Sequence, residues 1–128
     1  LAVPEQAVLT GREEHFYSVL KNLVSNARDA LVDTAGERAR CIRISAGEQG
    51  EQLRLEVEDT GPGIAPEDLE RIFEPFFSTK PETGVGLGLG VVRKLVLLYG
   101  GTVQVRSAVG LGTRFVLALP RGGARSEE

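Results

Sequence analysis

The stretch "GVGLGLG", residues 84–90, places a glycine at every second position, directly before an apolar run. Glycine costs conformational entropy in any regular element, so this concentration of glycines needs a reason. The segment is either a flexible connector or a backbone that approaches another group closely. Residues 88–99 predict a long, mostly buried helix that is stopped by Gly100 and Gly101. Because linkers are rarely so apolar, the close approach is the favoured interpretation.

The familiar phosphate-binding loops do not match this stretch. A Walker loop needs a lysine after its last glycine, and none stands there. The dinucleotide fingerprint needs a third glycine, but Leu89 or Val91 occupies that place when the motif starts at Gly84 or Gly86. The segment nevertheless precedes a helix, and the free N–H groups and dipole of a helix N-terminus attract anions.

The rest of the chain shows both helix and strand patterns. Apolar residues at three- and four-residue spacings predict a helix over 12–33. A short helix is predicted from Pro66 to about Phe73, followed by an irregular stretch. The predicted strands are 41–47, 52–59, 102–108 and 112–120, with turns at 47–51 and Gly110. These elements predict helices on one face of a mixed or antiparallel sheet, as one domain over 1–120 with a disordered tail over 121–128.

The composition excludes several classes of function. The chain has 128 residues, 41% of them hydrophobic, which suits a single core. Fifteen basic and eighteen acidic residues give a net charge of −3, which argues against a nucleic-acid partner. The single Cys41 cannot form an internal disulfide, so we expect a reducing, cytoplasmic compartment. The sequence has no signal-peptide pattern and no membrane-length apolar run, and its start without Met leads us to expect a domain of a longer protein.

Two asparagines stand inside the first predicted helix. Asn22 and Asn26 are four residues apart, so they share one helix edge, which Asp29 and Asp33 continue. Asparagine is a mediocre helix former because its amide competes for backbone hydrogen bonds. The edge is either a solvated face or a site where an amide oxygen points into a cleft and coordinates a hard cation such as magnesium.

A polar break, "EDTGPGI" at 58–64, follows the second predicted strand. A carboxylate such as Asp59 at the end of a buried strand is costly unless a group donates to it. The exocyclic amino group of adenine is a suitable donor, and Gly61 and Gly63 would let a flat ring approach the backbone. An ordinary turn is the alternative interpretation, since turns use the same residue types.

Four stretches in this order resemble the ATP-binding catalytic domain of sensor histidine kinases, within the wider ATPase class of DNA gyrase and the mismatch-repair proteins. They are "NLVSNARDAL" (22–31, N box), "DTGPGI" (59–64, G1 box), "IFEPFFSTK" (72–80, F box) and "GVGLGLG" (84–90, G2 box). The closing "GLGTRFVLALP" also matches, so the resemblance runs from about Val8 to Pro120. The form "PFFSTK" resembles kinases of the nitrogen-regulation and oxygen-sensor type.

The resemblance implies an α+β fold, a two-layer sandwich whose mixed, mainly antiparallel sheet carries three helices on one face. It implies ATP and Mg²⁺ as cofactors, with Asn26 as the metal ligand and Asp59 as the adenine-binding residue. The implied catalytic residues are Asn22, Asn26 and Lys80, with Lys80 near the terminal phosphates. The implied nucleotide-binding residues are Asn26, Asp59, Gly61, Gly63, Ile64, Phe77, Lys80, Gly84, Gly86, Leu87, Gly88, Leu89 and Thr113.

Three positions depart from the patterns of related ATPases. Val85 replaces the usual threonine of the G2 box, which removes a hydroxyl but no backbone donor. Gly90 replaces the commonest residue, serine, and the sequence offers no role for it. Gyrase-type enzymes carry a glutamate general base where this chain has Asn22. Because an amide cannot take a proton from water, the sequence favours phosphotransfer over efficient hydrolysis.

The implied function is transfer of the ATP γ-phosphate to a histidine in two-component signalling. His15, the only histidine, lacks a phosphoacceptor context, so we interpret it as structural. The implied partners are a histidine-containing dimerisation domain and a response regulator receiver domain. We expect the isolated domain to be a monomer and the longer parent protein to be a homodimer. The parent could be a membrane-bound sensor with this part in the cytoplasm. Alternatives are a serine kinase of the anti-sigma-factor type and a nucleotide-binding module without catalysis.

Overall fold

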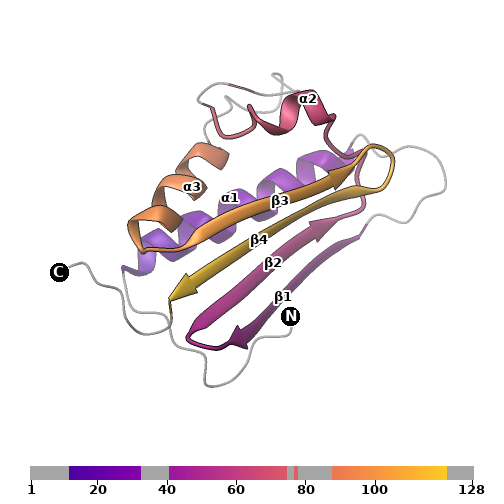
Figure 1. Cartoon of the computed structure of the whole chain (residues 1–128). Coiled ribbons are helices and arrows are strands. Elements are labelled where there is room, and N and C mark those ends of the chain that lie inside the picture. Colours follow the sequence, from indigo (N-terminus) through magenta and orange to yellow (C-terminus); the bar gives the residue numbers. More distant parts are fainter. Residues whose placement is uncertain (1–11, 33–40, 75–76, 78–87, 121–128) are drawn as a thin grey trace.

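The fold is a helical layer packed on one antiparallel sheet (Figure 1). The computed structural model describes residues 12–32, 41–74, 77 and 88–120. Its elements are α1 (Glu13–Val32), β1 (Ile42–Gln49), β2 (Gln52–Asp59), α2 (Pro66–Leu69), α3 (Gly88–Leu98), β3 (Thr102–Ala108) and β4 (Gly112–Pro120). The strand order is β1-β2-β4-β3, and every pairing among these described strands is antiparallel. The predicted two-layer α+β fold is confirmed, while no parallel pair, as a mixed sheet needs, occurs within the described residues.

Alternation along the strands separates two faces of the sheet. In β2 and β4 the residues Leu53, Val57, Phe115 and Leu117 are buried on the face that carries α1 and α3. The helices add Leu23 and other apolar side chains to the same core. The core therefore lies between the sheet and the helix pair, and Asp59, the last residue of β2, lies on the same face of the sheet.

The helix α3 ends as the sequence predicts. The N–H of Gly101 donates to the carbonyl of Val96 at 2.9 Å, and the N–H of Gly100 donates to that of Leu97 at 3.0 Å. This pair of bonds is a Schellman motif, and Gly100 takes the left-handed conformation that the motif requires, with φ of +77°. The chain can therefore leave the helix and enter β3 at once.

Two predicted boundaries are wrong. The helix α2 spans only Pro66–Leu69, not the stretch to Phe73, because the chain continues as turns in which Arg71 and Glu74 donate to carbonyls three residues earlier. These turns bury Ile72 in the core. The β1–β2 turn is also tighter than the predicted 47–51, since β1 pairs with β2 up to its last residue.

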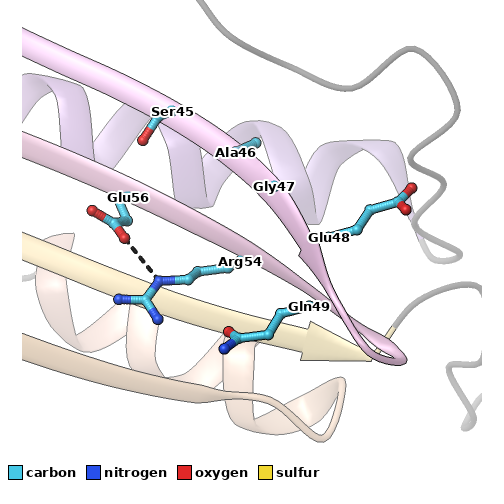
Figure 2. Close-up of a pocket in the computed structure, with 7 residues that line it drawn as sticks. All are labelled: Ser45, Ala46, Gly47, Glu48, Gln49, Arg54 and Glu56. Atoms are coloured by element: carbon cyan, nitrogen blue, oxygen red, sulfur yellow. Dashed lines mark hydrogen bonds and ion pairs between the residues drawn. The ribbon is translucent and has the colours of Figure 1, made fainter.

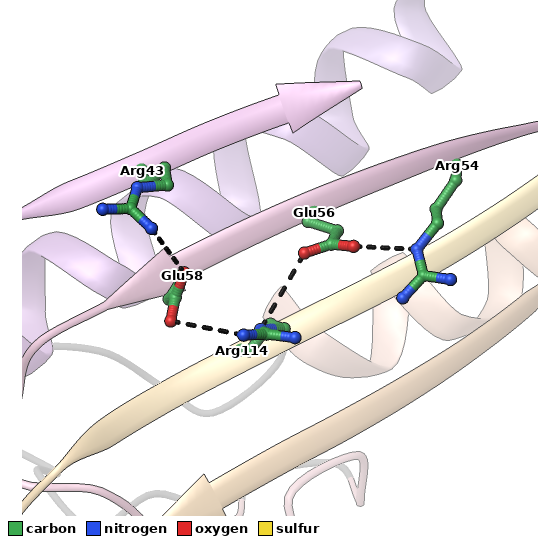
Figure 3. A network of polar contacts seen from close by, with 5 residues as sticks. All are labelled: Arg43, Arg54, Glu56, Glu58 and Arg114. Carbon is green, nitrogen blue, oxygen red and sulfur yellow. Dashed lines mark hydrogen bonds and ion pairs between the residues drawn. The ribbon is translucent and has the colours of Figure 1, made fainter. Parts of the chain in front are cut away.

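The face of the sheet opposite the helices carries a chain of ion pairs (Figure 3). Glu58 contacts Arg43 at 3.6 Å and Arg114 at 3.7 Å, and Glu56 contacts Arg114 at 3.8 Å and Arg54 at 2.7 Å. All five side chains are partly exposed, so each pair adds little stability. Within the described residues, no helix is long and apolar enough to cross a membrane.

Candidate functional site

Three polar side chains form a row across the sheet on its helical side. Asp59 at the end of β2 lies opposite Thr113 of β4, and Thr113 lies opposite Ser107 of β3. Asp59 and Thr113 are only 4% and 5% exposed. A buried carboxylate and a buried hydroxyl side by side need hydrogen-bond partners. The row is therefore the polar end of an otherwise apolar layer.

The loop after Asp59 is tied back to the sheet at several points. The carboxylate oxygen Oδ1 of Asp59 accepts a 2.8 Å hydrogen bond from the N–H of Gly61, which starts the turn. The N–H of Ile64 donates to Oγ of Ser107 at 2.7 Å, and the N–H of Gly110 donates to the carbonyl of Pro62 at 2.8 Å. The β3–β4 hairpin thus fixes the loop that the sequence predicts to bind the base.

The two glycines of this loop have a reason within the protein itself. A Cβ on Gly61 would stand 2.9 Å from Oδ1 of Asp59 and 3.0 Å from Cβ of Ala30. Gly63 has φ of +82°, and a Cβ there would collide with the carbonyl oxygen of Ala108. Close packing of the loop against α1 and β3 accounts for both glycines. Their contact with a bound base stays a prediction.

One edge of α1 connects this loop to the start of α3. Ala30 packs against Gly61, while Oδ1 of Asn22 lies 2.9 Å from the position of a Cβ on Gly88. Asn26 stands midway, four residues from each, so it lies one turn or about 6 Å along the helix from both. The Asn22 amide donates to the carbonyl of Ser18 at 2.8 Å. The structure therefore brings Asn22, Asn26 and the Asp59 loop to one edge of α1.

The residues along this edge of α1 fit a magnesium ion, which is the group that the N box implies. Asn26 is half-buried, and its amide oxygen is a hard ligand. Magnesium keeps several waters and is bound through one or two protein oxygens together with substrate phosphates. Phosphates between Asn26 and the start of α3 would also meet the N–H groups of that helix. A magnesium-bound triphosphate is chemically compatible with these residues.

The F-box and G2-box predictions are only partly within the described residues. Phe77 packs against the core, and Cζ of Arg71 lies 4.8 Å above its ring. Leu89, an implied nucleotide-binding residue of the G2 box, packs against the same core. The predicted site residues that lie outside the described residues are Lys80, Gly84, Gly86 and Leu87.

Sequence reasoning missed two residues around the site, Ser107 and Gly112, and left Gly90 without a role. Ser107 occupies an inward position of a strand whose other inward residues are valines, and that break in the alternation was the available signal. Gly112 has φ of +125°, and a Cβ there would collide with the carbonyl oxygen of Asp59. Gly90, which had no role, faces the carbonyl oxygen of Phe73, which would lie 3.1 Å from its Cβ. Both glycines therefore allow close packing.

His15 is placed as a structural residue, as expected. Its Nδ1 lies 2.7 Å from the hydroxyl of Tyr99, which also accepts a 2.9 Å hydrogen bond from the N–H of Arg12. The two rings pack edge to face, with centroids 5.6 Å apart. His15 thus ties the start of α1 to the end of α3, far along both helices from Asn22 and Gly88.

A shallow pocket of about 360 Å³ lies elsewhere, beside the β1–β2 turn (Figure 2). It is lined by Ser45, Ala46, Gly47, Glu48, Gln49, Arg54 and Glu56. None of these is a predicted site residue, and most belong to the sheet face opposite the helices. The pocket is therefore separate from the Asp59 row.

Known proteins resemble this chain along most of its length. A family model described as "Histidine kinase-, DNA gyrase B-, and HSP90-like ATPase" matches residues 11–123. The sensor histidine kinase ZraS of Escherichia coli O157:H7 is 47% identical over 102 residues, and the two-component sensor PprA of Pseudomonas aeruginosa is 42% identical over 122 residues. These matches cover 80% and 93% of this chain but only 21% and 13% of those proteins.

Solved structures agree with the fold. The catalytic domain of histidine kinase ThkA superposes with a TM-score of 0.73 at 33% identity, over 88% of this chain and 71% of that one. Full-length ShkA in complex with AMPPNP superposes with a TM-score of 0.74 at 32% identity, over 94% of this chain and 24% of that one. The similarity thus concerns one domain of much longer proteins as well as a domain solved separately.

Proposed function

The chain belongs to the histidine kinase-, DNA gyrase B- and HSP90-like ATPase family, as the ATP-binding catalytic domain of a histidine kinase, and we propose that it transfers the γ-phosphate of Mg-ATP to a histidine. That histidine would belong to a separate dimerisation and phosphoacceptor domain, since His15 is engaged with Tyr99. A response regulator would then accept the phosphate. The parent protein would be a homodimer with this domain in the cytoplasm.

One observation carries the proposal. The edge of α1 contacts the loop after Asp59 at Ala30 and the start of α3 at Asn22, with Asn26 between them. A nucleotide needs a polar group for the base at one end and anion-binding groups for the phosphates at the other. This edge connects two such places about two helical turns, or roughly 12 Å, apart. The ShkA structure that resembles this chain is itself a complex with AMPPNP.

The residues would divide the work of binding and orienting. The carboxylate of Asp59 accepts a hydrogen bond from the amino group of adenine, and Thr113 supports it. The amide oxygen of Asn26 holds the magnesium ion, and Lys80 neutralises the terminal phosphates. ATP supplies the phosphoryl group. Since phosphoryl transfer depends mainly on positioning and electrostatics, these residues need not form a covalent intermediate.

The position of Asn22 favours transfer to a protein over hydrolysis. Its amide is held by the carbonyl of Ser18 and faces Gly88. An amide cannot act as a general base, so a water molecule near the phosphates would not be activated there.

We further propose that the parent kinase is of the nitrogen-regulation or oxygen-sensor subtype, on the "PFFSTK" form of the F box.

The test is transfer in trans. The chain is mixed with the dimerisation domain encoded by its parent gene, Mg²⁺ and γ-labelled ATP, and the label is expected on the acceptor histidine. An acceptor domain with that histidine changed to glutamine is the control and should remain unlabelled. Label on a serine would instead identify a kinase of the anti-sigma-factor type. ATP binding with no label on the acceptor would identify a binding module without catalysis.

A further inference from the structure

Ser107 makes three hydrogen-bond contacts at the polar row, and none of them was foreseen from the sequence. Its Oγ lies 2.7 Å from the N–H of Ile64, 2.9 Å from the carbonyl of Gly112 and 2.9 Å from Oγ1 of Thr113. The three partners come from the loop after β2, from the first residue of β4 and from the residue opposite Ser107 in the sheet. Ser107 therefore joins the loop after β2, which contains Ile64, to the strand that carries Thr113.

The directions of these hydrogen bonds follow from counting protons. A serine hydroxyl donates one hydrogen bond and accepts two. The amide of Ile64 can only donate, and the carbonyl of Gly112 can only accept. The single proton of Ser107 therefore goes to Gly112, and the remaining contact requires Thr113 to donate to Ser107. The proton of the Thr113 hydroxyl is thus used within the protein.

This assignment leaves Thr113 as an acceptor toward any ligand. Thr113 stands directly opposite Asp59 in the sheet, and both side chains lie on the helical side. Directly opposite residues of antiparallel strands have Cβ atoms about 5 Å apart. Two neighbouring acceptors, one of them charged, suit hydrogen-bond donors, such as the N–H groups of the adenine amino group and the O–H of an ordered water beside it. They disfavour a base that presents a carbonyl oxygen there.

We propose that Ser107 is a positioning residue for base recognition, which acts by holding Thr113 as a hydrogen-bond acceptor and by fixing the amide of Ile64. The inference rests on the proposed nucleotide function, in which Asp59 and Thr113 meet the base. Ser107 itself need not touch the nucleotide. Its effect is selectivity for adenine over hypoxanthine, which carries an oxygen acceptor in place of the amino group.

The experiment compares the affinity of the full chain for Mg-ATP and Mg-ITP by calorimetry. Ser107→Ala releases the Thr113 proton, so the hydroxyl can donate to the carbonyl oxygen of hypoxanthine. The preference for ATP over ITP should fall about fivefold, the effect of one hydrogen bond of ordinary strength. Ser107→Thr keeps the hydroxyl and should stay within about twofold of the unmodified chain. In the nucleotide-free protein, Ser107→Ala should also speed hydrogen exchange at the Ile64 amide.

Two controls separate positioning from general destabilisation. Ser45→Ala makes the same change on the sheet face opposite the row and should leave the preference unchanged. Thr113→Val should lower the preference by itself, and adding Ser107→Ala to it should cause no further fall, because the effect passes through Thr113. An equal loss of ATP and ITP affinity in Ser107→Ala would show a merely structural role and overturn the inference.

The outcome also separates this inference from the proposed function. If the unmodified chain binds ATP, loses that binding in Asp59→Asn and keeps its preference for ATP in Ser107→Ala, the nucleotide function stands and the inference about Ser107 fails. If the unmodified chain binds neither nucleotide, the proposed function fails, and the inference fails with it.

Discussion

At the scale of single residues, Asp59 carries the prediction about the base, because it is a buried carboxylate at the end of β2. Asp59→Asn keeps the shape and an oxygen for the Gly61 N–H but removes the charge that favours an N–H donor. We expect the thermal stabilisation produced by Mg-ATP to disappear, which a melting experiment with and without nucleotide measures. Glu58→Gln, one residue earlier on the opposite face, is the matched control. A normal ATP-induced shift in Asp59→Asn would remove Asp59 from the adenine role.

Asn26 carries the second prediction at this scale. Asn26→Ala removes the amide oxygen that we assign to magnesium, while alanine suits the interior of α1 well. The expected result is that added Mg²⁺ no longer strengthens nucleotide binding, although binding without the metal changes little. Titrations of ATP at several Mg²⁺ concentrations measure this difference. If the metal dependence persists in Asn26→Ala, the metal ion is held by other residues.

At the scale of elements, the loop after β2 is shaped by its packing against the β3–β4 hairpin. Gly63→Ala would place a methyl group on the carbonyl oxygen of Ala108 at a positive φ. We expect the free energy of unfolding to fall by about 2 kcal/mol or more. Urea unfolding measures it, and Gly47→Ala is the control, because no atom lies within 4 Å of a Cβ there. A Gly63→Ala variant as stable as the control would mean that the loop is not locked by the hairpin.

Element boundaries show why parts of the fold were readable from the sequence and parts were not. The end of α3 follows from Gly100 and Gly101, since glycine is the residue that the left-handed helix end needs. The end of α2 was misjudged because a tertiary contact decides it: burial of Ile72 in the core favours turns over a longer helix. Local chemistry predicts the first kind of boundary, and only packing decides the second.

At the scale of the whole molecule, the sequence could suggest candidate site residues only where a residue type is energetically unfavourable at its own position in a helix or strand. Asp59 and Asn26 could be chosen as candidates from the sequence, because a carboxylate at the end of a buried strand and an amide inside a helix both need hydrogen-bond partners or ligands. Ser107 costs little by itself, and its three partners come from separate parts of the chain, so only the folded sheet shows them together. The glycines at 61 and 63 were recognised as important, but their contacts with Ala30 and Ala108 required the packed layers.

The separation between His15 and the candidate site predicts that the isolated chain cannot phosphorylate itself. His15 lies at the Tyr99 end of the helix pair, whereas Asn22 and Gly88 mark the other end, and the separation from His15 to Asn22 is seven residues or about 10 Å along α1. The isolated chain should therefore bind Mg-ATP without labelling itself, which incubation with γ-labelled ATP and denaturing electrophoresis would test. Since His15 holds Tyr99, His15→Gln should lower the melting temperature while leaving transfer to the separate acceptor domain intact. Label on His15 in the isolated chain would contradict both its structural role and the need for a separate phosphoacceptor.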